Sequence, residues 1–180
     1  MQVLIGLGNS PEEYANTRHN TGFMAIDYLA EKHNINLVFD PDTDCMIGAN
    51  DGLILVKPYG FINESGKPVK EFLRKFSLEP RQIVAIHDAA DVPVGRFGTR
   101  NGGSSEGHKG VKDIIDKIGP EFRRFRIGID RKDNMIDHVL GEFTPEEKSK
   151  INNIFVELDR NRIFLDADED VSDTGMRSIW

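Results

Sequence analysis

The chain has 180 residues, of which 38% are hydrophobic and 29% are charged, and its formal net charge is −7 with a sequence pI near 5.3. This length predicts one domain with a sizeable core, and the composition is ordinary for a soluble globular protein. A single cysteine, Cys45, excludes a disulfide framework and favours a reducing compartment. No apolar run approaches the roughly 18 residues of a membrane span, and no signal peptide opens the sequence, so we expect a cytoplasmic protein outside the membrane.

The predicted elements begin with a buried strand at 2–8, the apolar run QVLIGLG. Apolar residues at helical spacing then predict a helix over 21–33. The segments 35–39 and 45–49 are typical of short strands. The turn signal NDG leads into LILVKP, so residues 50–58 predict the second arm of a hairpin.

A helix is predicted over 63–78, with Ser65 as a candidate cap and Pro68 in the first turn. The run QIVAIHD at 82–88 predicts another buried strand, which ends at an aspartate. Residues 95–100 give a weaker strand signal. The next ten residues, NGGSSEGHKG, form a glycine-rich loop, and isoleucines at helical spacing predict a helix after it.

The alternating segment FRRFRIGID at 122–130 predicts a strand. A helix follows from Thr144, which is a candidate cap because Pro145 and two glutamates occupy the first turn. The acidic residues at 166–180 predict a poorly ordered tail. Strands that alternate with helices, with one hairpin inserted, predict an α/β fold. We expect a single three-layer domain over 1–180, with a mixed, mostly parallel twisted sheet flanked by helices.

Basic residues gather in the middle of this acidic sequence. From Arg96 to Lys132 there are ten Lys and Arg against five Asp and Glu, whereas from Asp133 to the end there are five against twelve. The overall charge argues against nucleic acid, but a basic middle on an acidic frame can form a local face that binds anions.

Polar side chains follow several predicted strands at their carboxyl ends, where open α/β sheets bind their ligands. Asn9 follows the first strand, His19 lies at the far side of the same loop, Asn63 follows the hairpin strand, and Asp88 ends the strand at 82–88. If these strands are neighbours, the side chains converge. A histidine beside a carboxylate is the basic unit of general base catalysis, and asparagine amides can position water or polarise a carbonyl.

Three other functions receive weaker support. The GLGN loop resembles a dinucleotide loop, but Pro11 stands at the third glycine position and no acidic ribose-binding residue is evident. The GSSEG segment fits the nucleophile-elbow pattern, with Ser105, Asp130 and His138 in the required order, but its loop is too rich in glycine. The remaining histidines are scattered without metal-ligand spacing, so we predict no metal.

Six segments, in the same order and at the same spacing, resemble bacterial-type peptidyl-tRNA hydrolase across roughly residues 2–160. They are GLGNSPEEYANTRHNTGF, KPYGFINESGKPV, IHDAADVPVGRFGTR, NGGSSEGHKGVKDI, FRRFRIGID and VLGEF. The resemblance implies an esterase without metal or cofactor, monomeric by default, that cleaves the bond between a peptide and the 3′ ribose of tRNA.

By motif match, the resemblance implies that His19 is the general base that activates water and that Asp88 orients it. It implies substrate-binding roles for Asn9, Tyr14, Asn63 and Lys109, contacts with tRNA phosphate for Arg100 and Arg126, and a mobile lid at 132–143. These roles are implied by the resemblance to the family and not by the spacing of the residues in the sequence.

Two departures from the family pattern leave an alternative open. Lys109 stands where the family has an asparagine, and NSPEEY replaces its Asn-Pro-Gly turn. A cation at Lys109 could bind a phosphate, stabilise an oxyanion, or pair with Asp88 and take that carboxylate from His19. The alternative is therefore a diverged, weakly active or inactive relative that acts as an RNA-binding protein.

Overall fold

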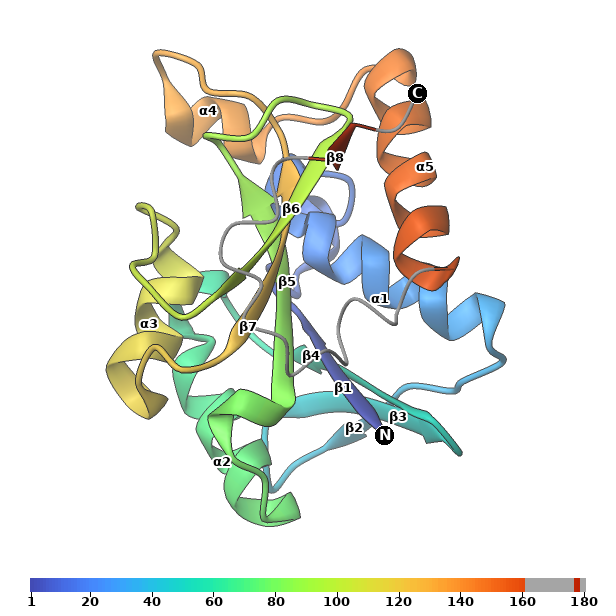
Figure 1. Ribbon diagram of the computed structural model, residues 1–180, viewed down its shortest axis with the longest axis vertical. Coiled ribbons are helices and arrows are strands. Elements are labelled where there is room, and N and C mark those ends of the chain that lie inside the picture. The colour runs from blue at the N-terminus through green and yellow to red at the C-terminus, as the bar shows by residue number, and fades with distance from the viewer. Residues whose placement is uncertain (161–176, 179–180) are drawn as a thin grey trace.

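The computed structural model describes residues 1–160 and 177–178, and Figure 1 shows a twisted sheet between two layers of helices. The sheet has the strand order β2-β3-β4-β1-β5-β7-β6-β8. Its strands are β1 (Gln2–Gly6), β2 (Val38–Asp40), β3 (Cys45–Asn50), β4 (Leu53–Pro58), β5 (Ile83–Ala89), β6 (Arg96–Asn101), β7 (Arg123–Gly128) and β8 (Arg177–Ser178). The α-helices are α1 (Thr21–Lys32), α2 (Gly66–Phe76), α3 (Lys109–Ile118), α4 (Met135–Leu140) and α5 (Pro145–Arg160).

The predicted three-layer α/β fold with a mixed sheet is confirmed, but the sheet is parallel only at its centre. Strands β4, β1, β5 and β7 are parallel to one another. The outer pairings β2-β3, β3-β4, β6-β7 and β6-β8 are antiparallel. The connection at 90–95 is too short for the crossover that a parallel neighbour requires, so β6 runs back against β7.

Two hydrophobic cores lie on opposite faces of the sheet. Helices α1 and α5 pack on one face and α2 and α3 on the other (Figure 1). Central strands are therefore covered on both sides, and all seven residues of β5 are buried. This explains why the segments of β1 and β5 are continuous apolar runs rather than alternating ones.

Gly22, in the first turn of α1, permits a close approach between this helix and the sheet. A Cβ atom at this position would collide with backbone atoms of Leu7 and Ile86. Helix α1 therefore crosses directly over the carboxyl ends of β1 and β5, and it begins two residues after His19.

The helix ends show where the sequence predictions hold and where they fail. Thr144 accepts a hydrogen bond from the backbone N–H of Glu147 at 3.2 Å and caps α5 as predicted. Ser65 occupies the N-cap position of α2, but its hydroxyl donates to the carbonyl of Ile62 at 2.7 Å and caps nothing. The predicted acidic tail at 166–180 lies outside the described residues, apart from 177–178. Across the part of the chain that the structure describes, no helix is both long and apolar enough to cross a bilayer.

Candidate active site

A cavity of about 450 Å³ opens beside the carboxyl ends of β1 and β5. It gathers most of the side chains that the sequence singled out. The predicted residues on its wall are Asn9, Tyr14, His19, Asn63, Asp88, Lys109 and Arg126. Arg100 does not line it. The apolar part of the wall includes Phe61, which sequence reasoning did not name, and four residues of α4 within the segment 132–143 that was predicted as a lid: Met135, Ile136, Val139 and Leu140.

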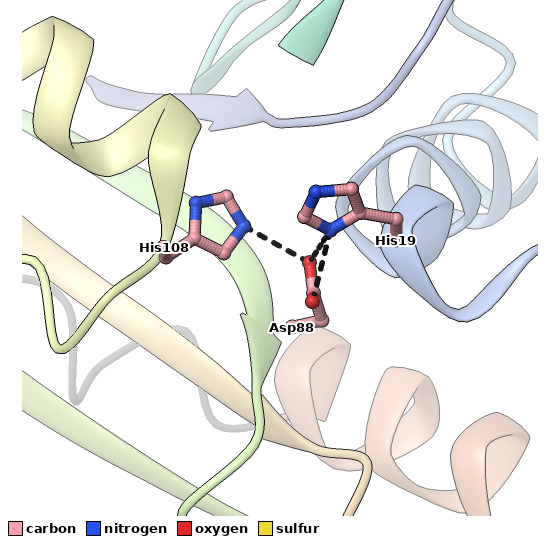
Figure 2. Close-up of side chains that lie close together, drawn as sticks. All are labelled: His19, Asp88 and His108. Carbon is pink, nitrogen blue, oxygen red and sulfur yellow. Dashed lines mark hydrogen bonds and ion pairs between the residues drawn. The ribbon is translucent and has the colours of Figure 1, made fainter. Parts of the chain in front are cut away.

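His19 and Asp88 are in direct contact. Nδ1 of His19 lies 2.9 Å from Oδ1 and 3.0 Å from Oδ2 of Asp88. Because an ionised carboxylate can only accept, Nδ1 carries the proton and donates. Nε2 of His19 is then left with its lone pair, and Figure 2 shows this second ring nitrogen pointing away from Asp88. The arrangement leaves a free basic nitrogen at the cavity.

His108 makes a second contact with the same carboxylate, which the sequence analysis did not predict. Its Nε2 lies 3.0 Å from Oδ1 of Asp88, on the opposite side from His19 (Figure 2). Its Nδ1 accepts from the backbone N–H of Val111 at 3.1 Å and so caps α3. Because Nδ1 accepts, the proton of His108 resides on Nε2, and this histidine is a neutral donor to Asp88.

The charge state of the pair follows from these contacts. Burial alone would raise the pKa of Asp88, but the two histidines hold the pKa of this carboxyl well below its usual range. For His19, burial alone would lower the pKa, yet the attraction and hydrogen bond of Asp88 outweigh burial and raise it above the usual 6.5. The positive charge of Lys109 opposes that rise. Asp88 is thus ionised, and it stabilises a proton on His19.

A short 3₁₀ turn, Arg18–Asn20, holds His19 in place through its two neighbours. The side-chain oxygen of Asn20 accepts from the backbone N–H of Asn9 at 2.8 Å, and its amide donates to the carbonyl of Asn9 at 2.9 Å. Arg18 is buried on the opposite side of the turn, against α4 and α5. The turn is therefore fixed to the end of β1 and to the segment around α4.

Asn9 presents an oriented amide to the cavity. Its Oδ1 accepts from the backbone N–H of Ile62 at 2.9 Å, which fixes the side-chain rotation. Its Nδ2 makes no hydrogen bond to any residue that the structure describes. This amide is a donor aimed by the fold, of the kind that can stabilise charge on a carbonyl oxygen.

Lys109 lies at the first position of α3, exposed on the cavity wall. The pairing of Lys109 with Asp88 that the sequence left open does not occur, because His19 and His108 occupy that carboxylate. Within residues 1–160 its ammonium has no hydrogen bond or ion pair. Lys109 is therefore a free cation beside His19.

Both predicted phosphate-binding arginines carry an acidic partner. Arg126 contacts Asp91 at 2.6 Å and 2.7 Å, and Arg100 contacts Glu106 at 2.6 Å. The hydroxyl of Ser104 donates to the same Glu106 oxygen at 2.7 Å. Any anion that reaches these arginines must share them with the carboxylates.

The rival assignments have no matching geometry. His138 donates to the carbonyl of Ile129 at 2.6 Å, and Asp130 accepts from the N–H of Val94 at 3.1 Å. Among the described residues, no hydrogen bond joins Ser105 to either of them, so no serine triad is assembled. The ligand atoms of His19, Asp88 and His108 lie within 4.8 Å of one another, as in a metal site. However, the capping bond keeps a proton on Nε2 of His108, which does not suit a metal ligand at that atom.

Comparison with known proteins identifies the family of this chain. The model of the family described as peptidyl-tRNA hydrolase matches residues 3–176. A peptidyl-tRNA hydrolase of Akkermansia muciniphila is 42% identical over 156 residues, which cover 84% of this chain and 82% of that protein. One from Lactiplantibacillus plantarum is 37% identical over 159 residues, with 85% and 86% covered. The crystal structure of peptidyl-tRNA hydrolase from Acinetobacter baumannii has a TM-score of 0.83 at 34% identity and covers 87% of this chain and 83% of that one. The chain belongs to the peptidyl-tRNA hydrolase family.

Proposed function

We propose that this protein hydrolyses the ester bond between the peptide and the 3′ ribose of tRNA in peptidyl-tRNA, with water as the nucleophile and His19 as the general base. The observation that carries the proposal is the His19–Asp88 contact, which holds the proton of the neutral imidazole on Nδ1, so that Nε2 is the basic nitrogen of this cavity-lining residue. An ester is activated enough to yield to a positioned water, so no side-chain nucleophile is needed.

In the proposed reaction, Nε2 of His19 removes a proton from water as the water oxygen attacks the ester carbonyl carbon. Asp88 stabilises the imidazolium that forms, and His108 keeps the carboxylate ionised and oriented. The amide of Asn9 donates to the carbonyl oxygen as negative charge develops there. The bond from the carbonyl carbon to the ribose oxygen then breaks, and His19 returns its proton to that oxygen.

Substrate binding is assigned to the residues around this pair. We assign Asn63 and Tyr14 to the 3′ end and its attached peptide, because both line the cavity. Lys109 adds a positive charge beside the reacting ester, which favours an anionic intermediate or a nearby phosphate. Arg100 and Arg126 are assigned to tRNA phosphates in the basic middle of the sequence.

The segment 132–143 is assigned as a lid. It contains α4, whose apolar side chains form one wall of the cavity and whose residue Ile136 is 66% exposed. This apolar surface lies beside a polar reaction centre, where it can exclude water from around the bound substrate. We further propose that the protein acts in the cytoplasm as a monomeric single domain.

The direct test is to incubate the protein with peptidyl-tRNA and follow the release of free tRNA. His19→Ala should lose about 10² to 10⁴-fold in turnover while it keeps its fold and its affinity for tRNA. Retention of half the wild-type rate would remove His19 from its role. The RNA-binding alternative predicts a wild type that binds tRNA without hydrolysis, and Lys109→Asn is the variant that would then restore activity.

A further inference from the structure

Arg18 joins the turn of His19 to α4, to the segment that follows α4 and to the start of α5. Its backbone N–H donates to the carbonyl of Gly141 at 2.9 Å. Its Nη1 lies 3.4 Å from the carbonyl of His138, and its Nη2 lies 2.8 Å from Oε2 of Glu147. The guanidinium also lies 5.2 Å from the ring centre of Phe143.

These contacts are buried and mutually dependent. The Arg18 side chain is 11% exposed, and its Nε has no hydrogen-bond partner among the described residues. The same Glu147 oxygen that accepts from Arg18 also accepts from the backbone N–H of Thr144 at 2.8 Å. A displacement of α4 or of the α5 start therefore separates a buried cation from its present partners, which is costly.

The backbone carries the same connection. Thr17 forms an isolated antiparallel bridge with Glu142, next to the bond between Arg18 and Gly141. There is little free space at this junction, since a Cβ on Gly141 would lie 3.0 Å from Nη1 of Arg18. The segment that leaves α4 is thus packed directly on the turn that presents His19.

We propose that Arg18 is a positioning residue that couples the placement of α4 to the orientation of His19, so that contact of substrate with α4 steadies the general base. The coupling rests on the proposed hydrolytic function. Arg18 does not line the cavity, and the described residues that contact the Asp88 carboxylate are His19 and His108, so the effect of Arg18 on the reaction passes through His19, its neighbour in the chain.

The test compares Arg18→Met, Arg18→Lys and Glu147→Gln with Arg74→Met, which changes an exposed arginine on α2 whose ion-pair partner is Glu71. We expect Arg18→Met to lower kcat about 10-fold with KM within about two-fold, since misplacement of a catalytic group by a fraction of an ångström is enough for such a loss. Arg18→Lys should recover part of kcat, Glu147→Gln should reproduce part of the loss, and Arg74→Met should match wild type.

Two further readouts separate coupling from a structural role. Hydrogen exchange at 135–142 should speed up in Arg18→Met well below its melting temperature. Ile136→Ala, a change on the side of α4 that lines the cavity, should lower kcat in wild type but have little further effect in Arg18→Met. A variant with lower melting temperature but unchanged kcat, or with a raised KM alone, overturns the proposal. If wild type itself fails to hydrolyse peptidyl-tRNA, the proposed function falls, whereas the exchange measurement still tests the coupling.

Discussion

Nδ1 of His19 lies 2.9 Å from Oδ1 of Asp88, although 69 positions separate the two residues in the chain. The sheet brings them together because β1 and β5 are adjacent and parallel, with both carboxyl ends at the same edge. The contact was the main spatial prediction drawn from the sequence, and the hydrolytic proposal depends on it.

Asp88→Asn should reduce kcat/KM about 100-fold or more and move the acid limb of its pH profile to lower pH. Burial favours the neutral form of His19, and the Asp88 carboxylate is what raises its pKa above 6.5. Without the carboxylate, burial dominates and His19 is neutral down to a lower pH. The measurement is the pH dependence of kcat/KM, with exposed Asp51→Asn as the control. An acid limb that stays in place would remove Asp88 from its assigned role.

The wild-type enzyme should lose activity as the pH falls through a value above 6.5. His19 must be neutral to accept a proton from water, and its pKa is raised in the folded protein, so protonation inactivates it earlier than it would an ordinary histidine. Lys109→Gln should move this limb to still higher pH, since the Lys109 charge opposes protonation of His19. The matched control is Lys112→Gln, one turn along α3, where an exposed lysine pairs with Asp116. Equal shifts in the two variants would contradict a local effect of Lys109.

Glu106→Gln should tighten tRNA binding by up to about five-fold at moderate salt. The Glu106 carboxylate contacts Arg100 at 2.6 Å and competes with phosphate for it, and an exposed ion pair of this kind is weak enough for a polyanion to displace. The slope of log affinity against log salt should also steepen by about one unit, because one more cation is available to phosphate. Asp116→Asn is the control, since it removes an equal charge from the outer face of α3. If both variants tighten tRNA binding equally, the effect comes from net charge, and competition between Glu106 and phosphate for Arg100 is contradicted.

Gly22→Ala should lower the free energy of unfolding by about 1–3 kcal/mol, because the added methyl group pushes α1 away from the ends of β1 and β5. Turnover should also fall under conditions in which the variant is fully folded, because the turn that carries His19 leads directly into this helix. Denaturant unfolding measures the first effect and turnover at a temperature far below the melting point measures the second. Gly98→Ala, with nothing within 4 Å of the added carbon, should leave stability unchanged.

The sequence was most informative at the central strands, where an apolar run marks the strand and the polar residues that follow it mark the site. Apolar runs located the central strands, and polar residues at their ends located His19 and Asp88. The prediction of a mostly parallel sheet was wrong at the edges because pairing direction depends on connection length and on which strand lies nearest. Helix α4 was not predicted because six residues carry too little periodicity to identify it.

Other parts of the site depend on contacts that a linear pattern does not contain. His108 could have been suspected as a cap, since it precedes a helix with an apolar stripe, but its donation to Asp88 requires the end of β5 to lie beneath it. Arg100 and Arg126 were predicted as cations, yet their pairing with Glu106 and Asp91 arises from loop geometry. The roles of Asn63 and Tyr14 remain predictions.

The position of β5 between β1 and β7 has a consequence for folding during synthesis on the ribosome. The first strand and its histidine leave the ribosome early, but their partner strand follows some eighty residues later, and its other edge is covered only when β7 emerges. A growing chain that ends before β5 therefore lacks Asp88, and one that ends before β7 lacks the strand that covers the second edge of β5.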